Sequence, residues 1–185
     1  MIAYLKNYHS VPRIARVAGL LKTTEIQNDR YEFMIVQDKT ICFSTDGYSC
    51  ELDDISRDSI AVLHTGDIVT INTKGIFNRI FDSQENNATV FLTSLCNSNF
   101  IMCPTTDGER KNEGGMSDEW MIEYIELLPE NLNHVVVTGG EPTLRTELFF
   151  RVMARLAERF PEIEVLLLSN GRSFAASSIV NRLSD

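Results

Sequence analysis

The sequence predicts an α/β protein, in which a small antiparallel β domain precedes the first half of a (βα) barrel with parallel strands. Three observations support this fold class. Residues 1–87 hold short runs rich in Val, Ile, Phe and Tyr that polar turns separate. From residue 88 onward, continuous apolar runs alternate with segments of helical periodicity. The resulting order βαβαβα implies parallel strands joined by right-handed crossovers.

The N-terminal region, residues 1–87, is predicted to form a small barrel or sandwich. Its apolar runs are short and closely spaced, which is typical of antiparallel sheets. The expected strands cover residues 13–20, 31–37, 40–44, 68–72 and 76–81. A polar stretch without periodicity, residues 83–87, is expected to link this domain to the next.

Isolated cysteines and histidines of the N-terminal region do not form a recognisable site. Cys42 and Cys50 flank a turn and have the neighbours of strand residues, so we expect small buried hydrophobic side chains. His9 and His64 stand alone in the sequence, and a lone histidine is usually a satisfied polar residue. We therefore expect the chemistry of the chain to lie elsewhere.

The C-terminal region, residues 88–185, is predicted to hold three βα units. Its expected strands cover residues 88–95, 134–138 and 163–168, and its expected helices cover residues 117–128, 144–160 and 173–183. Ser117 has the side chain of an N-cap, and Pro129 and Pro161 end the first two helices. A complete eightfold barrel needs roughly 250 residues, so this region is too short to form one.

Charge and hydropathy limit the possible partners and compartments. The formal net charge of −9 and the pI near 4.8 argue against nucleic acid, because an acidic protein repels a phosphate backbone. No apolar run approaches the length of a membrane span, and the N-terminus lacks a signal peptide. We therefore expect a cytoplasmic protein without membrane association, whose cysteines are free thiols or metal ligands.

Each predicted strand of the C-terminal region ends in a loop of unusual composition. These loops are the cysteine loop (residues 96–103), the GGEP loop (residues 139–142) and the SNG loop (residues 169–171). Because parallel strands place their carboxyl ends at one edge of a sheet, the three loops should meet there. This convergence predicts a functional site more strongly than any one of the loops does.

The GGEP loop has two interpretations. Gly139 and Gly140 would let the backbone approach a ligand closely, with Glu141 pointing into the site as an anion. Pro142 suits the start of the following helix. Alternatively, the segment is a tight βα turn with a solvent-facing glutamate. The residues themselves leave both interpretations open.

The other two loops are also ambiguous when each is taken alone. Ser169 and Asn170 can hydrogen-bond a ligand, but both residue types are common in ordinary loops. Cys96 and Cys103 suggest a metal ion or an iron–sulfur cluster. Two thiolates cannot complete a structural zinc site, which takes four ligands, so two free cysteines are the alternative.

Taken together, the three loops resemble the first half of a radical S-adenosylmethionine (radical SAM) enzyme. The segments FLTSLCNSNFIMCP, VVVTGGEPTL and LLLSNG occur in the order found in that family. The resemblance covers about residues 88–185 and implies a partial (βα) radical-SAM barrel. It also implies a [4Fe-4S] cluster held by Cys-x3-Cys-x2-Cys, and reductive cleavage of S-adenosylmethionine to a 5′-deoxyadenosyl radical.

The resemblance assigns roles to individual residues. Cys96 corresponds to the first cluster ligand and Cys103 to the third, whereas Phe100 stands at the position of the second. The GGEP loop matches the family segment that holds the methionine amino group. Ser169 and Asn170 match ribose or carboxylate contacts, and Met102 matches a residue that packs near adenine. The implied cofactor-binding residues are Gly139, Gly140, Glu141, Pro142, Ser169, Asn170 and Met102.

A narrower resemblance extends into the N-terminal region. The segments TGDIVTI and NATVFLTSLCNSN are similar to the radical SAM maturase of the His-Xaa-Ser peptide-modification system, its C-type protein. This similarity implies a peptide or protein substrate that contains repeats. It also implies that a partner maturase acts with the chain.

Two departures from the family predict that this chain lacks the family's activity. A phenyl ring cannot ligate iron, so Phe100 prevents a three-cysteine cluster and the electron transfer that depends on it. The chain also holds three βα units where the family has six, which would leave substrate contacts missing and a sheet edge unpaired. Both features are typical of a fragment, a frameshifted copy or a decaying gene.

Two other functions are compatible with the sequence. A non-catalytic peptide-binding or scaffold protein could keep the same fold and bind its partner without a cofactor. Alternatively, the two cysteines could hold a metal ion such as zinc that is shared across a dimer. The first alternative predicts partner binding without iron, and the second predicts metal in aerobically purified protein.

Overall fold

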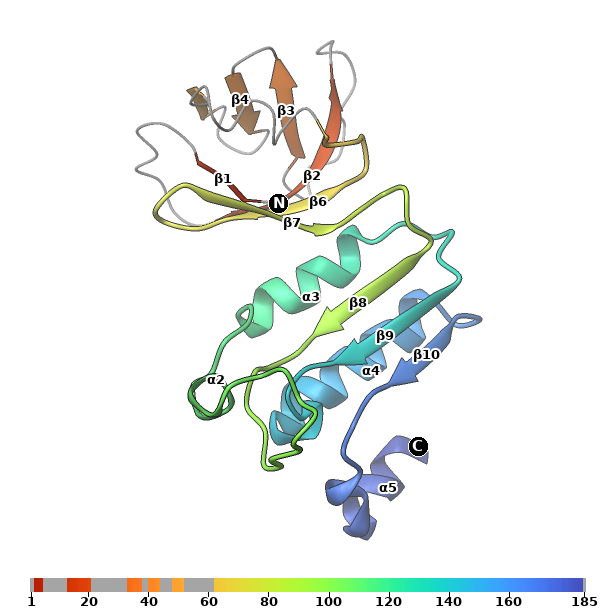
Figure 1. Cartoon of the computed structure of the whole chain (residues 1–185). Helices are drawn as coiled ribbons and strands as arrows, with labels where there is room; N and C mark the ends of the chain where they lie inside the picture. Colours follow the sequence, from red (N-terminus) through yellow and green to blue (C-terminus); the bar gives the residue numbers. More distant parts are fainter. Residues whose placement is uncertain are drawn as a thin grey trace. The chain divides into compact units, whose positions relative to one another are not determined.

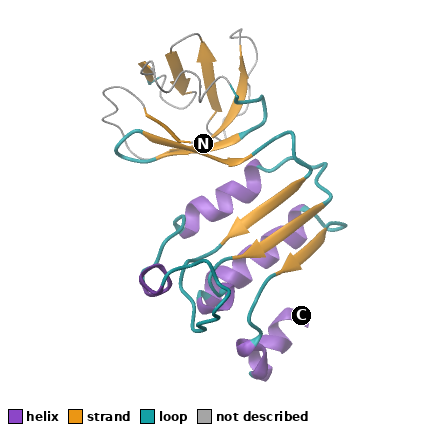
Figure 2. Cartoon of the chain, viewed as in Figure 1, coloured by secondary structure: helices purple, strands orange, loops and turns teal. Residues whose placement is uncertain are grey.

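The computed structural model describes residues 2–4, 13–20, 33–37, 40–43, 48–51 and 62–184 of the chain. The chain divides into two compact units. Unit 1 comprises residues 1–86 and 127–129, and unit 2 comprises residues 87–126 and 130–185. Figure 1 follows both units along the sequence, and in Figure 2 all the helices drawn come after the eighth strand of the chain.

The described strands of unit 1 form one seven-stranded sheet with the order β1-β7-β6-β2-β3-β4-β5. They are β1 (Ile2–Tyr4), β2 (Arg13–Leu20), β3 (Phe33–Gln37), β4 (Thr40–Phe43), β5 (Ser49–Glu51), β6 (Ile68–Ile71) and β7 (Ile76–Phe81). Neighbouring strands are antiparallel except β2 and β3, which are parallel. The predicted antiparallel sheet is therefore confirmed with one exception. Strands β1 and β5 are the two ends of this order, and a barrel or sandwich stays a prediction for unit 1.

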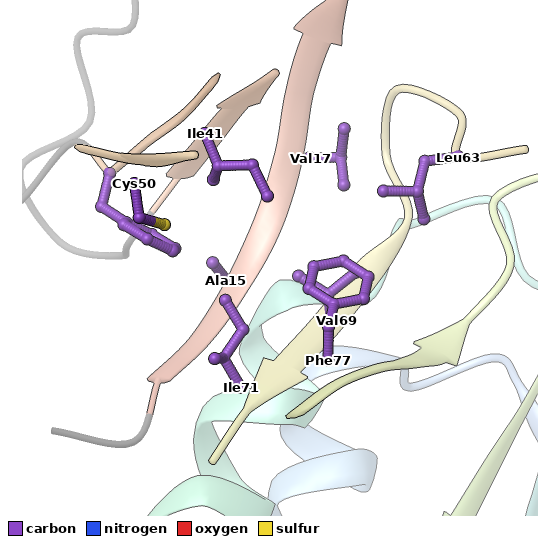
Figure 3. Close-up of a cluster of buried hydrophobic side chains, with 9 residues drawn as sticks. Ala15, Val17, Ile41, Cys50, Leu63, Val69, Ile71 and Phe77 are labelled. Carbon is purple, nitrogen blue, oxygen red and sulfur yellow. The ribbon is translucent and has the colours of Figure 1, made fainter. Parts of the chain in front are cut away.

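One face of this sheet carries the core of unit 1, which Figure 3 shows in close-up. Buried side chains recur at every second residue of a strand, because successive side chains of a strand point to opposite faces. The buried cluster consists of Ala15, Val17, Ile41, Phe43, Cys50, Leu63, Val69, Ile71 and Phe77. Burial raises the pKa of the Cys50 thiol to about 11, as expected of a small buried side chain. Cys42 is half-buried.

Asp67 ties the ends of β6 and β7 together. Its fully buried carboxylate accepts hydrogen bonds from the backbone N–H of Ser83 (2.7 Å) and of His64 (3.0 Å). Burial by itself raises the pKa of Asp67, but these bonds and one from Arg79 lower it below its usual value.

His64, expected to stand alone, lies close enough to Asp67 and Asp82 to share a metal ion. However, the guanidinium of Arg79 already forms ion pairs with both carboxylates.

Unit 2 is built on a parallel sheet of three strands with the order β10-β9-β8. They are β8 (Asn87–Phe91), β9 (His134–Thr138) and β10 (Glu164–Leu167), and Figure 1 shows the three arrows pointing the same way. This arrangement confirms the parallel strands predicted from the βαβαβα order. The first strand ends at Phe91 rather than at residue 95, because the chain beyond it bonds to the loop that follows β9.

Helices α3 (Asp118–Leu127) and α4 (Thr146–Arg159) supply the apolar side chains that bury one face of this sheet. Buried residues alternate with exposed ones in β8 and with half-buried ones in β9, so one face of the sheet is more deeply covered than the other. Tyr124 of α3 is buried, and its hydroxyl donates to the carbonyl oxygen of Thr89 (3.2 Å). Ser117 caps α3 as predicted, since its hydroxyl oxygen accepts from the N–H of Trp120 (3.2 Å).

The remaining helices differ from the sequence prediction at their starts. The structure contains a helix that the sequence analysis did not predict, α2 (Asp107–Lys111). It begins with a reciprocal capping box between Thr106 and Glu109. Short 3-10 turns, η1 (Pro142–Leu144) and η2 (Arg172–Ala175), precede α4 and α5 (Ser177–Ser184), so both helices start later than expected. Among the helices that the structure describes, none has the length and apolar character of a bilayer span.

Candidate functional site

The three loops predicted to converge do meet at the carboxyl edge of the parallel sheet. The GGEP loop follows the central strand β9 and bonds directly to the segment after β8. Gly140 N–H donates to the carbonyl of Thr93, and Glu141 N–H donates to that of Leu95, both at 2.7 Å. These two bonds continue the pairing of β8 and β9 past their ends. As a result, the backbone leading to Cys96 has a fixed path.

The two glycines of the GGEP loop are required by this contact between loops. A Cβ atom added to Gly139 would lie 2.5 Å from the carbonyl oxygen of Thr93. One added to Gly140 would overlap the carbonyl oxygens of Ser94 and Leu95. From the sequence, these glycines were predicted to let the backbone approach a ligand closely. In the structure they let one backbone segment pass close to another.

Glu141 is fully buried, so the predicted alternative of a solvent-facing glutamate is wrong. Its carboxylate accepts from the hydroxyl of Thr143 (2.6 Å) and from the N–H of Thr143 (3.1 Å). Across the loops it accepts from the N–H of Asn170 (2.7 Å) and from the hydroxyl of Ser169, which lies 2.9 and 3.1 Å from its two oxygens. The chain itself thus supplies donors to both oxygens of this carboxylate.

These donors determine the charge of Glu141. Burial alone would raise the pKa of the carboxyl group, because it disfavours the ionised form. The hydrogen bonds from Thr143, Asn170 and Ser169 outweigh burial and hold the pKa below its ordinary value. Glu141 is therefore a buried anion, and its negative charge links the GGEP loop to the SNG loop.

Asn170 connects the SNG loop to the cysteine loop. Its side-chain amide donates to the side-chain oxygen of Asn97 (2.8 Å) and to the hydroxyl oxygen of Ser98 (3.0 Å). Arg172 adds a bond to the backbone carbonyl of Asn97 (3.0 Å). The predicted pair of Ser169 and Asn170 therefore bridges the other two loops. No signal in the sequence distinguished this role from ligand binding.

The cysteine loop contains Cys96 and Cys103 as free, half-buried thiols. Phe100, at the position of the middle ligand, is 52% exposed, and Met102 is 80% exposed. Neither side chain contributes to the core, so their identities are not dictated by packing in this structure. The pKa of Cys103 is lowered, first by the backbone N–H and the hydroxyl of Thr105 and then by the charge of Arg110.

The residues of this loop do not fit a three-thiolate iron–sulfur cluster. Cys96 and Cys103 are the thiols of this loop, and the phenyl ring of Phe100 has no atom that can bind iron. Cys42 and Cys50 belong to unit 1. For zinc, no histidine or acidic residue within the described ranges joins both thiols in a group that could hold an ion. These residues therefore do not supply the ligands that cluster chemistry needs.

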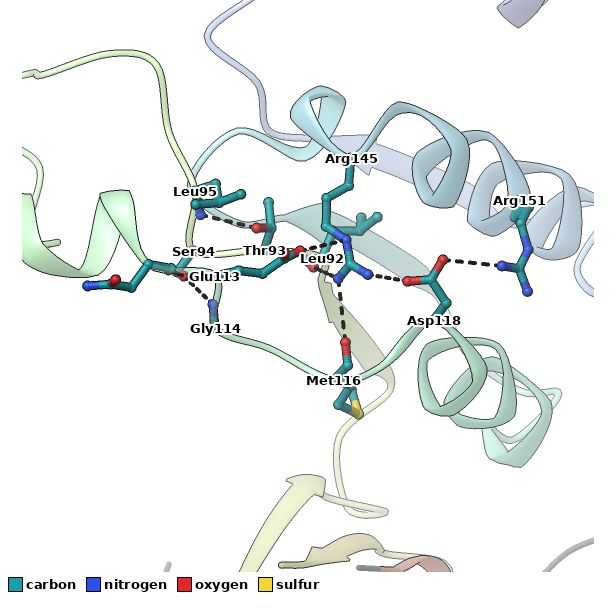
Figure 4. A network of polar contacts seen from close by, with 11 residues as sticks. Leu92, Thr93, Ser94, Leu95, Glu113, Gly114, Met116, Asp118, Arg145 and Arg151 are labelled. Carbon is teal, nitrogen blue, oxygen red and sulfur yellow. Dashed lines mark hydrogen bonds and ion pairs between the residues drawn. The ribbon is translucent and has the colours of Figure 1, made fainter.

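Arg145 is a site residue that the sequence interpretation missed. Figure 4 shows its guanidinium between three segments. It donates to the carbonyl of Leu92 at the end of β8 (3.1 Å), forms an ion pair with Glu113 (3.0 Å), and pairs with Asp118 in the first turn of α3. Arg145 comes shortly after GGEP in the sequence, but no local pattern indicates that its partners lie on two distant segments.

Two cavities border the cysteine loop. The larger one, about 640 Å³, lies between the end of β8 and α2 and includes Phe91, Ser94 and Glu113 in its lining. The smaller one, about 210 Å³, is lined by Cys96 together with Asn97 to Asn99 and the α2 side chains Arg110 and Lys111. Because Asp107 of α2 also lines it, Cys96 faces a polar recess that carries charges of both signs.

Comparison with known proteins supports one superfamily. No protein-family model matches the chain, and no solved structure matches it. Over 85 residues the chain is 35% identical to the GTP 3′,8-cyclase of Nautilia profundicola, a radical SAM enzyme. The match covers 44% of this chain and 26% of the cyclase, so the chain spans about a quarter of the length of that relative. This similarity supports the radical SAM superfamily, whose members in general use a [4Fe-4S] cluster and S-adenosylmethionine.

Replacing Gly140 should separate the two loops that it brings together. We expect Gly140→Ala to lower the free energy of unfolding by about 1–3 kcal/mol, because the added methyl group overlaps two carbonyl oxygens. Urea denaturation followed by circular dichroism measures the change. Gly108→Ala is the matched control, since its Cβ would meet only the Thr106 hydroxyl oxygen at 4.0 Å and would sit in a helix. Equal stability of the Gly140→Ala variant and the wild type would contradict the close contact.

The buried charge of Glu141 should make stability depend on pH. Because the pKa of Glu141 is depressed in the folded state, its stabilisation is present above the ordinary value of 4.5 and is lost as the pH falls through the folded value. We expect Glu141→Gln to cost about 1.5–3 kcal/mol at pH 7, since an amide N–H₂ would face N–H and hydroxyl donors. Unfolding measured at pH 7, 5, 4 and 3 should show the difference from wild type shrinking with acid. A difference that does not change with pH would contradict a buried anion.

Proposed function

We propose that this chain is a radical SAM maturase-like protein of the peptide-modifying His-Xaa-Ser lineage, and that it has lost cluster-dependent chemistry. The observation that carries the proposal is Phe100, which stands where the lineage has its middle cluster cysteine. The partial match to a radical SAM enzyme supports the superfamily. Peptide modification rests on the resemblance of TGDIVTI and NATVFLTSLCNSN to that lineage.

The environment of Glu141 supports the loss of cofactor chemistry. In the lineage this glutamate holds the amino group of S-adenosylmethionine. In this chain its carboxylate is fully buried and accepts hydrogen bonds from Thr143, Ser169 and Asn170. To bind an ammonium group, Glu141 would have to break contacts that also hold the SNG loop. We therefore propose that the GGEP and SNG loops retain their family positions mainly as structural elements.

The other residues of the three loops would lie against the cofactors wherever these are bound. Gly139, Gly140 and Pro142 shape the backbone path that would border S-adenosylmethionine, and Met102 would lie near its adenine. Cys96 and Cys103 would bind iron only weakly, because two thiolates leave two coordination positions of a [4Fe-4S] cluster without a protein ligand. The expected partners are a repeat-containing peptide or protein and a second maturase.

A non-catalytic peptide-binding or scaffold protein is the second candidate. The observation that favours it is that the chain's own hydrogen bonds, from Gly140 to Thr93 and from Asn170 to Ser98, join the three loops. Loops joined in this way can present a stable surface to a partner. This candidate shares the fold with the first and differs in requiring no iron.

Anaerobic reconstitution with iron and sulfide tests the loss of the cluster. We expect the wild-type chain to bind far fewer than about four irons and to lack a stable [4Fe-4S] absorption spectrum. Phe100→Cys should raise the iron content several-fold, because it restores the Cys-x3-Cys-x2-Cys spacing. Met102→Cys is the matched control, since it adds an exposed thiol to the same loop at the wrong spacing. A wild-type chain with about four irons would refute the proposal, whereas a Phe100→Cys variant with no gain would show that Phe100 is not the main cause of the loss.

Peptide binding in the presence of oxygen and a chelator tests the second candidate. A fluorescent peptide containing His-Xaa-Ser repeats should bind the wild-type chain saturably, as followed by fluorescence anisotropy. A peptide of the same composition in scrambled order serves as the control. If both peptides bind equally, or if neither binds, the peptide-binding candidate is wrong.

A further inference from the structure

We infer that hydrogen bonds from the guanidinium of Arg110 hold the cysteine loop of this chain in its conformation. In a loop with three cysteines, metal–thiolate bonds would have that role. The loop is therefore folded in the complete absence of metal. This inference goes beyond the proposed loss of the cluster, because a loop without its cluster could equally well lack a defined structure.

Arg110 lies on α2, and its side chain is only 9% exposed. Its Nε and Nη2 donate to the backbone carbonyl of Thr105 at 3.0 and 2.6 Å. Its Nη1 donates to the backbone carbonyl of Ser98 (3.2 Å) and to the side-chain oxygen of Asn99. The planar, multidentate shape of the guanidinium suits three acceptors on two segments of one loop. It therefore joins the start of the cysteine loop to the segment just after its end.

The backbone of Arg110 adds a further connection. Its carbonyl oxygen accepts a hydrogen bond from the N–H of Cys96 (3.2 Å). The short helix α2 holds this carbonyl in position, because its first turn is closed by the capping box of Thr106 and Glu109. Side chain and backbone of Arg110 thus fix both ends of the loop.

Asn170 and Arg172 hold the loop from the opposite side through Asn97 and Ser98. Within the loop, the N–H of Cys103 donates to the carbonyl of Phe100 (3.0 Å) and closes a turn. The exposed apolar side chains are therefore confined to the tip of a loop whose two ends are bound. N–H groups of the protein donate to the loop carbonyls of Asn97, Ser98 and Phe100, so these carbonyls do not depend on water for a hydrogen bond.

Hydrogen exchange of the metal-free chain in EDTA tests this inference. We expect the amides of Cys96 and Cys103 to be protected in the wild type. Arg110→Met keeps the length of the side chain but removes its donors, so it should lower the protection of both amides by about tenfold or more. Arg110→Lys should behave similarly, because a single ammonium cannot reproduce the planar fork. Arg151→Met, which removes an exposed arginine of α4, should leave both amides unchanged.

The outcomes separate the alternatives. Unprotected amides in the metal-free wild type would overturn the inference, as would full protection in either Arg110 variant. The amides of β9 report whether each variant is folded. If Arg110→Met does not fold, Arg110→Lys decides. All measurements are made without iron, so they do not depend on whether the proposed loss of the cluster is correct.

Discussion

The buried carboxylate of Glu141 is the constraint on which the carboxyl edge of the parallel sheet depends. An ionised group without water must have hydrogen-bond donors, because an unpaired buried charge is strongly unfavourable. Here the donors come from Thr143 on the same turn and from Ser169 and Asn170 on the next loop. Asn170 then reaches the cysteine loop through Asn97 and Ser98. The hydrogen bonds that this one negative charge requires therefore link the three loops.

Arginine side chains donate hydrogen bonds to backbone carbonyls around this edge. Loops of irregular backbone leave carbonyl oxygens without the partners that helices and sheets provide. Arg145 supplies donors to the end of β8 and to the segment before α3, and Arg110 supplies them to the cysteine loop. Both guanidiniums are largely covered by the protein. Fixed cations of this kind stabilise a loop geometry without any bound ligand.

The sequence predicted the features that depend on local patterns. The parallel strands could be read from apolar runs alternating with helical periodicity, and the N-cap at Ser117 from its side chain and neighbours. The meeting of the cysteine, GGEP and SNG loops followed from the rule that parallel strands end at one edge. The parallel pairing of β2 and β3 in unit 1 was not predictable, because pairing depends on contacts between segments distant in sequence.

The same limit applies to the site. The sequence motifs predicted which loops would lie close together but not which atoms would form hydrogen bonds. Glu141 was expected to face either a ligand or solvent, and it is instead enclosed by hydroxyl and N–H groups from two loops. Arg110 and Arg145 carry no motif, since their roles depend on carbonyls brought close by the fold. The helix α2 was detectable in principle from Thr106 and Glu109, which have the spacing of a capping box.

The tight passage of Gly139 and Gly140 against Thr93 and Leu95 has a consequence for which positions of these loops can be substituted. Any larger side chain at either glycine would collide with backbone, so a stable fold requires both glycines whether or not the loops bind a cofactor. Phe100 is under no such steric constraint, because it lies at an exposed loop tip. Position 100 therefore accepts side chains of different size and chemistry, whereas positions 139 and 140 accept only hydrogen. A glycine pair in such a loop is accordingly a sign of close contact between backbone segments, and by itself it does not report a bound cofactor.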